Sequence, residues 1–135
     1  MTPFLDTNVL VYAVLSDDPR RPAAERLLAA GGTVSVQVLN EFANVARTKL
    51  KWPWIDIEAT LALVRSRSDR VRDISVLTHE TAIALARDHN LAFYDALIVA
   101  SAIEAGCDIL YSEDMQHGRI IGGLAIVNPF HENAP

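Results

Sequence analysis

Residues 4–12 read Phe-Leu-Asp-Thr-Asn-Val-Leu-Val-Tyr, and this stretch begins a pattern that continues along the chain. Two apolar residues, Phe4 and Leu5, predict a short strand that stops at Asp6, and an apolar helix is expected from Asn8 to Leu15. A strand that passes directly into a helix is the first half of an α/β unit. This stretch therefore predicts the fold class and places a carboxylate at the end of the first strand.

Beyond this stretch, short apolar runs alternate with longer stretches of helical period. The further predicted strands are Thr33–Val36, Ile74–Leu77, Asp108–Tyr111 and Leu124–Val127. The further predicted helices start at Pro19–Pro22, at Val38, at Asp56, at Thr78 and at Asp95. Alternating strands and helices imply parallel pairing with helices on both faces. We therefore predict a three-layer α/β/α sandwich with a central four- or five-stranded parallel sheet.

Length and composition are those of an ordinary globular chain. The chain has 135 residues, of which 50% are hydrophobic, and we expect residues 1–135 to form a single domain. The longest uncharged apolar runs are far shorter than the roughly 20 residues that cross a bilayer. The N-terminus has no basic region of a signal peptide, and one cysteine, Cys107, excludes an internal disulfide. We expect a cytoplasmic protein with no membrane partner.

The formal charge is −5, from 12 basic and 17 acidic residues, and a general nucleic-acid binder is usually basic. Four of the acids, however, are expected to gather at one site. A cluster of acids that binds divalent cations is neutralised by those cations. Net charge therefore does not exclude a polyanionic substrate.

Two of these acids follow predicted strands, since Asp6 comes directly after the first and Asp114 comes shortly after the strand that ends at Tyr111. Asp95 begins a helix that is apolar nearly all round, and Glu41 lies in the first turns of another helix. Ligands of open α/β sheets bind beyond the carboxyl ends of the strands. We therefore expect all four carboxylates at that edge.

Each acid taken alone also has a structural explanation. Asp95 is explained as an N-cap and Glu41 as a solvated helix residue. Asp6 and Asp114 are explained as loop residues that end strands. Together, however, four carboxylates repel one another unless they hold a hard cation, and Mg²⁺ and Mn²⁺ prefer oxygen ligands. The chemistry that follows is metal-assisted phosphodiester hydrolysis.

Short polar residues accompany these acids. Thr7 and Asn8 follow Asp6, and Ser112 precedes Asp114 by two positions. Their hydroxyl and amide groups are suited to orienting a carboxylate or a metal-bound water. Helix capping by Thr7 or Asn8 and a turn at Ser112 are equally good explanations, so both interpretations stay open.

Four blocks of the sequence, in order and over nearly the whole chain, resemble the PIN-domain nucleases, in particular the VapC toxins of type II toxin–antitoxin systems. The blocks are Phe-Leu-Asp-Thr-Asn-Val-Leu-Val-Tyr at 4–12, Val-Leu-Asn-Glu-Phe at 38–42, Tyr-Asp-Ala-Leu-Ile-Val-Ala-Ser-Ala at 94–102 and Tyr-Ser-Glu-Asp-Met-Gln-His-Gly at 111–118. The resemblance implies a Mg²⁺- or Mn²⁺-dependent ribonuclease that forms a homodimer and is inhibited by a cognate antitoxin protein.

The resemblance also implies roles for single residues. It makes catalytic metal ligands of four acids, which are Asp6, Glu41, Asp95 and Asp114. Ser112 supports Asp114, and Asn8 matches the polar position of the family after its first Asp. Glu113 has no role that the resemblance assigns.

Basic residues offer further candidates. Four arginines lie within eight residues, and we hypothesise that they contact RNA together with His117; they are Arg65, Arg67, Arg70 and Arg72. A solvated helix end explains the arginines equally simply, and a turn explains His117.

Other functions remain open. A PIN-type RNA-processing nuclease without an antitoxin, and a non-catalytic RNA- or protein-binding module of the same fold, both fit the sequence. A haloacid-type phosphatase fits poorly, because it needs a second Asp where this chain has Asn8 and a positioned lysine, whereas the only lysines are Lys49 and Lys51.

Overall fold

The computed structural model describes residues 2–15 and 17–131. Within these ranges, six strands form one sheet in the order β3-β2-β1-β4-β6-β5. The strands are β1 (Phe4–Leu5), β2 (Thr33–Ser35), β3 (Arg70–Arg72), β4 (Ile109–Tyr111), β5 (Ile120–Ile121) and β6 (Leu124–Val127). All neighbouring pairs are parallel except β5 and β6.

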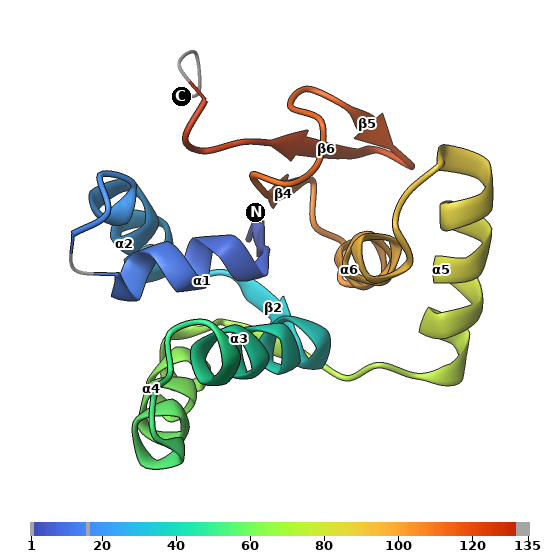
Figure 1. Ribbon diagram of the computed structural model, residues 1–135. Helices are drawn as coiled ribbons and strands as arrows, with labels where there is room; N and C mark the ends of the chain where they lie inside the picture. The colour runs from blue at the N-terminus through green and yellow to red at the C-terminus, as the bar shows by residue number, and fades with distance from the viewer. Residues whose placement is uncertain (1, 16, 132–135) are drawn as a thin grey trace.

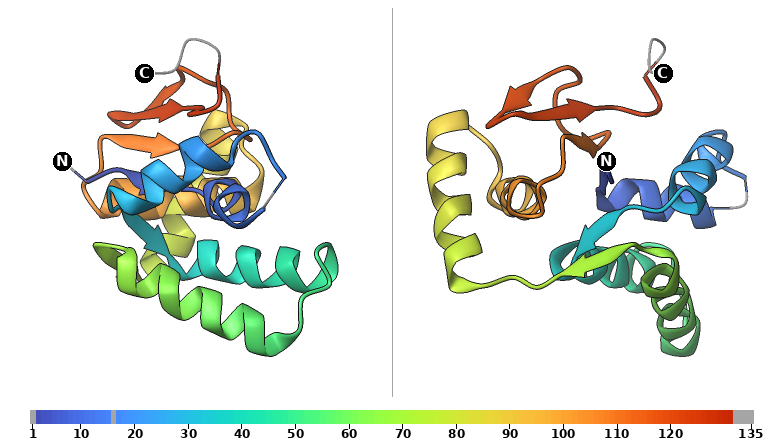
Figure 2. Two further views of the ribbon diagram at one scale, coloured as in Figure 1. Left: turned by 90° about the vertical axis from the view of Figure 1, so that its left-hand side faces the viewer. Right: turned by 180° about the vertical axis from the view of Figure 1, so that it is seen from behind.

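Helices cover both faces of this sheet. They are α1 (Thr7–Val14), α2 (Arg21–Ala29), α3 (Val36–Thr48), α4 (Trp54–Arg67), α5 (Val76–His89) and α6 (Phe93–Glu104). Figure 1 and the right view of Figure 2 show α1 to α4 on one side of the sheet and α5 and α6 on the other. The predicted α/β/α fold class is confirmed.

The core lies between the sheet and the helices that directly follow its strands. Phe4 and Leu5 of β1 are fully buried, as the continuous apolar run predicts for a strand covered on both faces. Residues 96–102 of α6 are all buried, which confirms that this helix is central. No helix in the described part of the chain is long and apolar enough to span a bilayer.

The prediction of a strand at Ile74–Leu77 is wrong. The third strand is Arg70–Arg72 at the edge of the sheet, and α5 already begins at Val76. Ser75 caps this helix through a capping box with Thr78, the residue that the sequence predicts as the cap. The apolar pair Val76 and Leu77 therefore lies exposed in a first helical turn, because the capping hydrogen bonds set the start of the helix.

The sheet also has more strands than the predicted four or five. Ile120–Ile121 and Leu124–Val127 form an antiparallel hairpin around Gly122 and Gly123, whose φ angles are +56° and +82°. Positive φ at both central residues is the geometry of a tight hairpin turn, and glycine adopts it without strain. The apolar run 120–127 is thus divided into two strands.

Three further helices start two residues earlier than predicted, and the first of these is α3, which begins at Val36 instead of Val38 because Ser35 is its N-cap. Pro53 is the N-cap residue of α4, and Asp56, where the sequence predicts the helix to start, lies in its first turn. In α6, the N-cap is Ala92 and Asp95 lies in the first turn rather than before it.

Candidate functional site

Asp6 lies where β1 ends and α1 begins, and its side chain is almost completely buried, with 2% of its surface exposed. One carboxylate oxygen, Oδ1, accepts a hydrogen bond from the backbone N–H of Thr7 at 2.6 Å. The other, Oδ2, accepts one from the hydroxyl of Ser112, also at 2.6 Å. The carboxylate of Asp6 is therefore held in one orientation from both sides.

The parallel register of β1 and β4 explains the contact with Ser112. Leu5 pairs with Tyr111, so the residues that directly follow them, Asp6 and Ser112, meet at the carboxyl edge of the sheet. The Ser112 hydroxyl also accepts a hydrogen bond from the backbone N–H of Asp114 at 3.2 Å. Ser112 thus donates to the carboxylate of Asp6 and also closes the turn to the backbone of Asp114, so both interpretations of Ser112 describe a contact that it makes.

Burial raises the pKa of Asp6 from 3.8 to about 7. The hydrogen bonds from Ser112 and Thr7 lower this pKa, whereas the negative charges of Asp114 and Glu41 raise it further. Burial dominates because a carboxylate loses most of its hydration at such a position. Near neutral pH, the site therefore stabilises either a proton or a cation on Asp6.

The other three acids come from separate elements. Glu41 on α3 accepts a hydrogen bond from the hydroxyl of Thr7 at 2.7 Å. Asp114 accepts one from the side-chain amide of Asn8 at 3.0 Å. Asp95 on α6 is half-buried, and its pKa is raised by burial and then by the charges of Asp114 and Glu41.

One cavity of about 630 Å³ receives all four predicted acids, together with Thr7 and Asn8. α1 and α3 both start at the carboxyl edge of the sheet, directly after β1 and β2, and they contact each other along the cavity. Sequence reasoning missed four polar residues of the same cavity, namely Gln37, Asn40, Asn44 and Tyr94. Gln37 and Asn44 lie one helical turn before and after Glu41, and Asn40 and Tyr94 directly precede Glu41 and Asp95. This closeness to the predicted acids is the signal that could have identified them.

The four acids are suitable ligands for a hard divalent cation such as Mg²⁺ or Mn²⁺, because such cations prefer carboxylate oxygens. Among residues 2–15 and 17–131, however, no three His, Cys, Asp or Glu side chains lie close enough together to hold a metal ion as they stand. Glu41 and Asp114 are instead held by Thr7 and Asn8. Binding of a cation by three of the acids requires these side chains to turn toward one another.

The residues predicted to contact RNA lie outside the cavity. Two of the arginines, Arg65 and Arg67, are in the last turn of α4. Arg70 is on the edge strand β3, where its guanidinium donates to the backbone oxygen of Ala105 at 2.7 Å. Arg72 ends the same strand.

His117 supports the C-terminal segment instead of the cavity. Its Nδ1 accepts a hydrogen bond from the backbone N–H of Asn128 at 3.0 Å, and its ring stacks on that of His131 with the centroids 4.1 Å apart. These contacts agree with the simpler interpretation of His117 as a structural loop residue.

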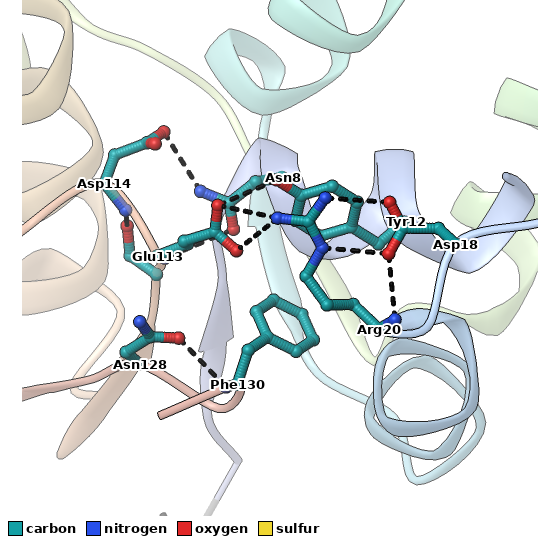
Figure 3. Close-up of polar contacts among 9 residues, drawn as sticks. Asn8, Tyr12, Asp18, Arg20, Glu113, Asp114, Asn128 and Phe130 are labelled. Carbon is teal, nitrogen blue, oxygen red and sulfur yellow. Dashed lines mark hydrogen bonds and ion pairs between the residues drawn. The ribbon is translucent and has the colours of Figure 1, made fainter. Parts of the chain in front are cut away.

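A second polar cluster, which the sequence did not reveal, lies beside the acids (Figure 3). The carboxylate of Glu113 accepts hydrogen bonds from the Tyr12 hydroxyl at 2.8 Å and from Arg20 at 3.1 Å. Arg20 also lies over the ring of Tyr12, 3.7 Å from its centroid, and pairs with Asp18. Burial, followed by the contact with Glu113, raises the pKa of Tyr12 to about 12.

This cluster anchors the loop that carries Asp114. Asn8 and Tyr12 are one helical turn apart on α1, so both side chains reach the same loop. Asn8 contacts Asp114 while Tyr12 contacts Glu113, as Figure 3 shows. Glu113 therefore has a positional role that sequence analysis could not assign.

Comparison with solved structures finds proteins of the same fold. VapC20 of Mycobacterium tuberculosis, a toxin that cleaves the sarcin-ricin loop, has 24% identity and a TM-score of 0.71 over 84% of this chain and 90% of its own. VapBC2 of Rickettsia felis, solved bound to a DNA fragment from its promoter, has 23% identity and a TM-score of 0.67 over 93% and 97%. A toxin–antitoxin complex of Klebsiella pneumoniae has 22% identity and a TM-score of 0.71 over 96% and 98%.

At such low identities, these likenesses show a shared fold and no more. A comparison with curated proteins found no match. The sequence itself matches the model of the PIN domain over residues 4–122. That match includes the end of β1, the part of α3 that carries Glu41, the start of α6 and the loop after β4. Because it covers most of the 135 residues, the chain belongs to the PIN domain family.

Proposed function

We propose that this protein is a Mg²⁺- or Mn²⁺-dependent ribonuclease that hydrolyses RNA phosphodiester bonds, and that it is the VapC toxin of a toxin–antitoxin pair. The observation that carries the proposal is the convergence of Asp6, Glu41, Asp95 and Asp114 on one cavity from four separate segments of the chain. Membership of the PIN family supports it, as does the likeness in fold to an RNA-cleaving toxin.

In this proposal the four acids hold the cation, and Glu41 and Asp114 turn from their present hydrogen bonds with Thr7 and Asn8 toward the other two acids to do so. A divalent cation bound there lowers the pKa of water and neutralises charge on the scissile phosphate. Thr7 and Ser112 fix the carboxylate of Asp6, and Asn8 holds that of Asp114 until the cation binds. Asp95 lies in the first turn of α6, which packs on the opposite face of the sheet from α1 and α3, and it lines the same cavity.

Cleavage of RNA by the purified protein tests this proposal. We expect cleavage with Mg²⁺ or Mn²⁺ and none with EDTA, measured on total RNA and on synthetic single strands. Because a contaminating nuclease would give the same result, Asp6→Asn purified in the same way is the control. Equal cleavage with EDTA, or by the variant, would contradict the proposal.

An antitoxin and a second copy of the chain are the proposed protein partners. Solved proteins of this fold include toxin–antitoxin complexes. Co-expression with a small protein encoded beside the gene should yield a stable complex that no longer cleaves RNA, and light scattering should show a dimer of the chain alone. Cleavage with no inhibitory neighbour would favour an RNA-processing nuclease.

Glu113→Gln is expected to lower the cleavage rate by about tenfold at saturating RNA, because residues that orient metal ligands typically contribute 10–100-fold. The variant loses the ion pair with Arg20, while Gln at this position still accepts the Tyr12 hydroxyl. The measurement is kcat and KM, and Glu58→Gln on the exposed part of α4 is the matched control. A change confined to KM would indicate an RNA contact instead.

The arginines outside the cavity remain candidates for the RNA backbone. Replacing Arg65 and Arg67 by Gln should weaken RNA binding and reduce the dependence of log Kd on log salt by about 0.7 for each phosphate that is no longer neutralised. The two residues lie exposed at the end of α4, so the fold should tolerate the change. An unchanged slope would assign this surface to solvent or to a protein partner.

A further inference from the structure

The wall of the cavity that α3 forms is lined by side-chain amides. Gln37, Asn40 and Asn44 lie three to four residues apart and share the cavity face of the helix with Glu41. Val38, Phe42 and Ala46 of α3 are buried in the core instead. Within the described part of the chain, none of the three amide groups has a hydrogen-bond partner. Both the donor and the acceptor of each are therefore available to a ligand.

An aromatic ring lies in the same cavity. Tyr94 precedes Asp95 in the first turn of α6 and lines the cavity with it, yet 60% of Tyr94 is exposed. The rings of Tyr94 and Phe93 form an inclined pair, with the centroids 5.6 Å and the planes 61° apart, and Phe93 in turn contacts His79. The Tyr94 ring thus has an aromatic neighbour and yet keeps most of its surface exposed. A planar ligand that stacks on the exposed surface of Tyr94 would remove apolar surface from water.

The charges of the cavity narrow the class of ligand. Its lining residues include four carboxylates and neither Lys nor Arg. An anionic group is therefore attracted only through a bound cation, whereas a neutral ring is accepted by the aromatic and amide side chains. Its volume of about 630 Å³ lies within the usual range of small-molecule sites.

We propose that this cavity is a binding site for an unpaired nucleotide, in which Tyr94 stacks on the base and the amides of α3 recognise its edge, with adenine preferred. Aromatic stacking on unpaired bases is a general mode of RNA recognition. Asn and Gln complement the N6 donor and N7 acceptor of adenine, whereas guanine is recognised mostly by Arg or Lys. One part of this site depends on the proposed function: the phosphate of the nucleotide is held by the cation that the acids bind. The contacts with the base do not depend on it.

Binding of nucleoside 5′-monophosphates in the presence of Mg²⁺, followed by NMR titration, tests this site. A monophosphate has no phosphodiester bond, so binding is measured independently of cleavage. We expect AMP to bind at least about fivefold more tightly than UMP. Tyr94→Ala should weaken AMP binding by at least about fivefold, while Tyr94→Phe retains it, since stacking needs the ring and not the hydroxyl.

The role of the α3 amides in recognising adenine is tested by the selectivity for AMP over UMP. Gln37→Ala and Asn44→Ala should each lower the ratio of AMP to UMP affinity toward one. Two matched controls lie outside the cavity lining: Gln116→Ala removes an exposed amide, and Trp54→Ala removes a ring that is 56% exposed. Neither control should change the affinity or the ratio. Melting temperatures of all variants verify that the fold is kept.

The outcomes separate this inference from the proposed function. Tyr94-dependent binding of AMP without RNA cleavage would support the site and contradict the nuclease. Metal-dependent RNA cleavage with equal affinity for AMP and UMP, or with AMP binding unchanged in Tyr94→Ala, would overturn the site and leave the nuclease standing. The exposed ring would then be assigned to a protein partner. Absence of any AMP-induced shift also overturns the proposed site.

Discussion

Asp6→Asn and Asp95→Asn are each expected to reduce RNA cleavage by at least about 100-fold while leaving the protein folded. Each change removes one negative charge from the proposed cation site but keeps the size of the side chain. Loss of a charged metal ligand removes several kcal/mol of transition-state stabilisation, and about 3 kcal/mol already corresponds to more than 100-fold. The measurement is kcat/KM at matched metal concentration, with circular dichroism to confirm the fold.

Asp56→Asn is the matched control for this pair. Asp56 is an exposed carboxylate in the first turn of α4 and does not line the cavity, so its loss should leave kcat/KM unchanged. Raising the metal concentration should restore part of the activity of Asp95→Asn, because the half-buried Asp95 is one of several oxygen ligands in the proposal. Full activity in either site variant would remove that residue from the catalytic site.

The metal-free protein is expected to lose stability as pH rises from about 4 to about 7, and Asp6→Asn is expected to abolish most of this loss. The raised pKa means that the folded state binds a proton on Asp6 more tightly than the unfolded state does. Between the two pKa values the folded state therefore holds more protons, and its free energy of unfolding falls with rising pH. The rise from 3.8 to about 7 corresponds to roughly 4 kcal/mol.

Urea denaturation in EDTA at several pH values measures this effect. The variant and the wild type should have similar stability near pH 4, and the variant should be more stable at pH 8. The side-chain oxygen of Asn can still accept the hydrogen bond from the Thr7 N–H, while its amide group would donate to the Ser112 hydroxyl, which reverses that bond, so the cap at the start of α1 is preserved. Adding Mg²⁺ at pH 8 should raise the melting temperature of the wild type more than that of the variant. A variant less stable than the wild type at pH 8 would contradict the clustering of the acids.

The sequence predicted the fold where apolar runs and helix signals agree. Phe4 and Leu5 followed by Asp6 indicated the first strand and its end, and residues 96–102 indicated the central helix. Local signals failed at β3 and α5. There, the apolar residues Val76 and Leu77 are exposed, and an edge strand of alternating arginines replaces the expected buried strand. An apolar run predicts a buried strand only if the folded chain places that run in the core, and the run at Val76 and Leu77 is not placed there.

The sequence predicted those parts of the candidate site that follow directly from the order of strands and helices. Asp6 and Asp114 follow strands, so topology alone places them at the carboxyl edge. Glu41, in contrast, meets Thr7 across 34 residues of sequence, and Ser112 meets Asp6 across 106. Such contacts depend on strand register and helix packing, which no local pattern encodes.

The sequence by itself determined the kinds of chemical group available and their order along the chain. Four acids, the polar residues beside them and a strand–helix alternation were sufficient to predict an α/β fold with an acidic edge. Only the tertiary structure decided which side chains share the cavity. It excluded His117 and the arginines from the lining, joined Glu113 to Tyr12 and Arg20, and placed Tyr94 in one cavity with the amides of α3. The physical reason is that hydrogen bonds act over about 3 Å and electrostatic interactions over about 10 Å in space, irrespective of separation along the chain.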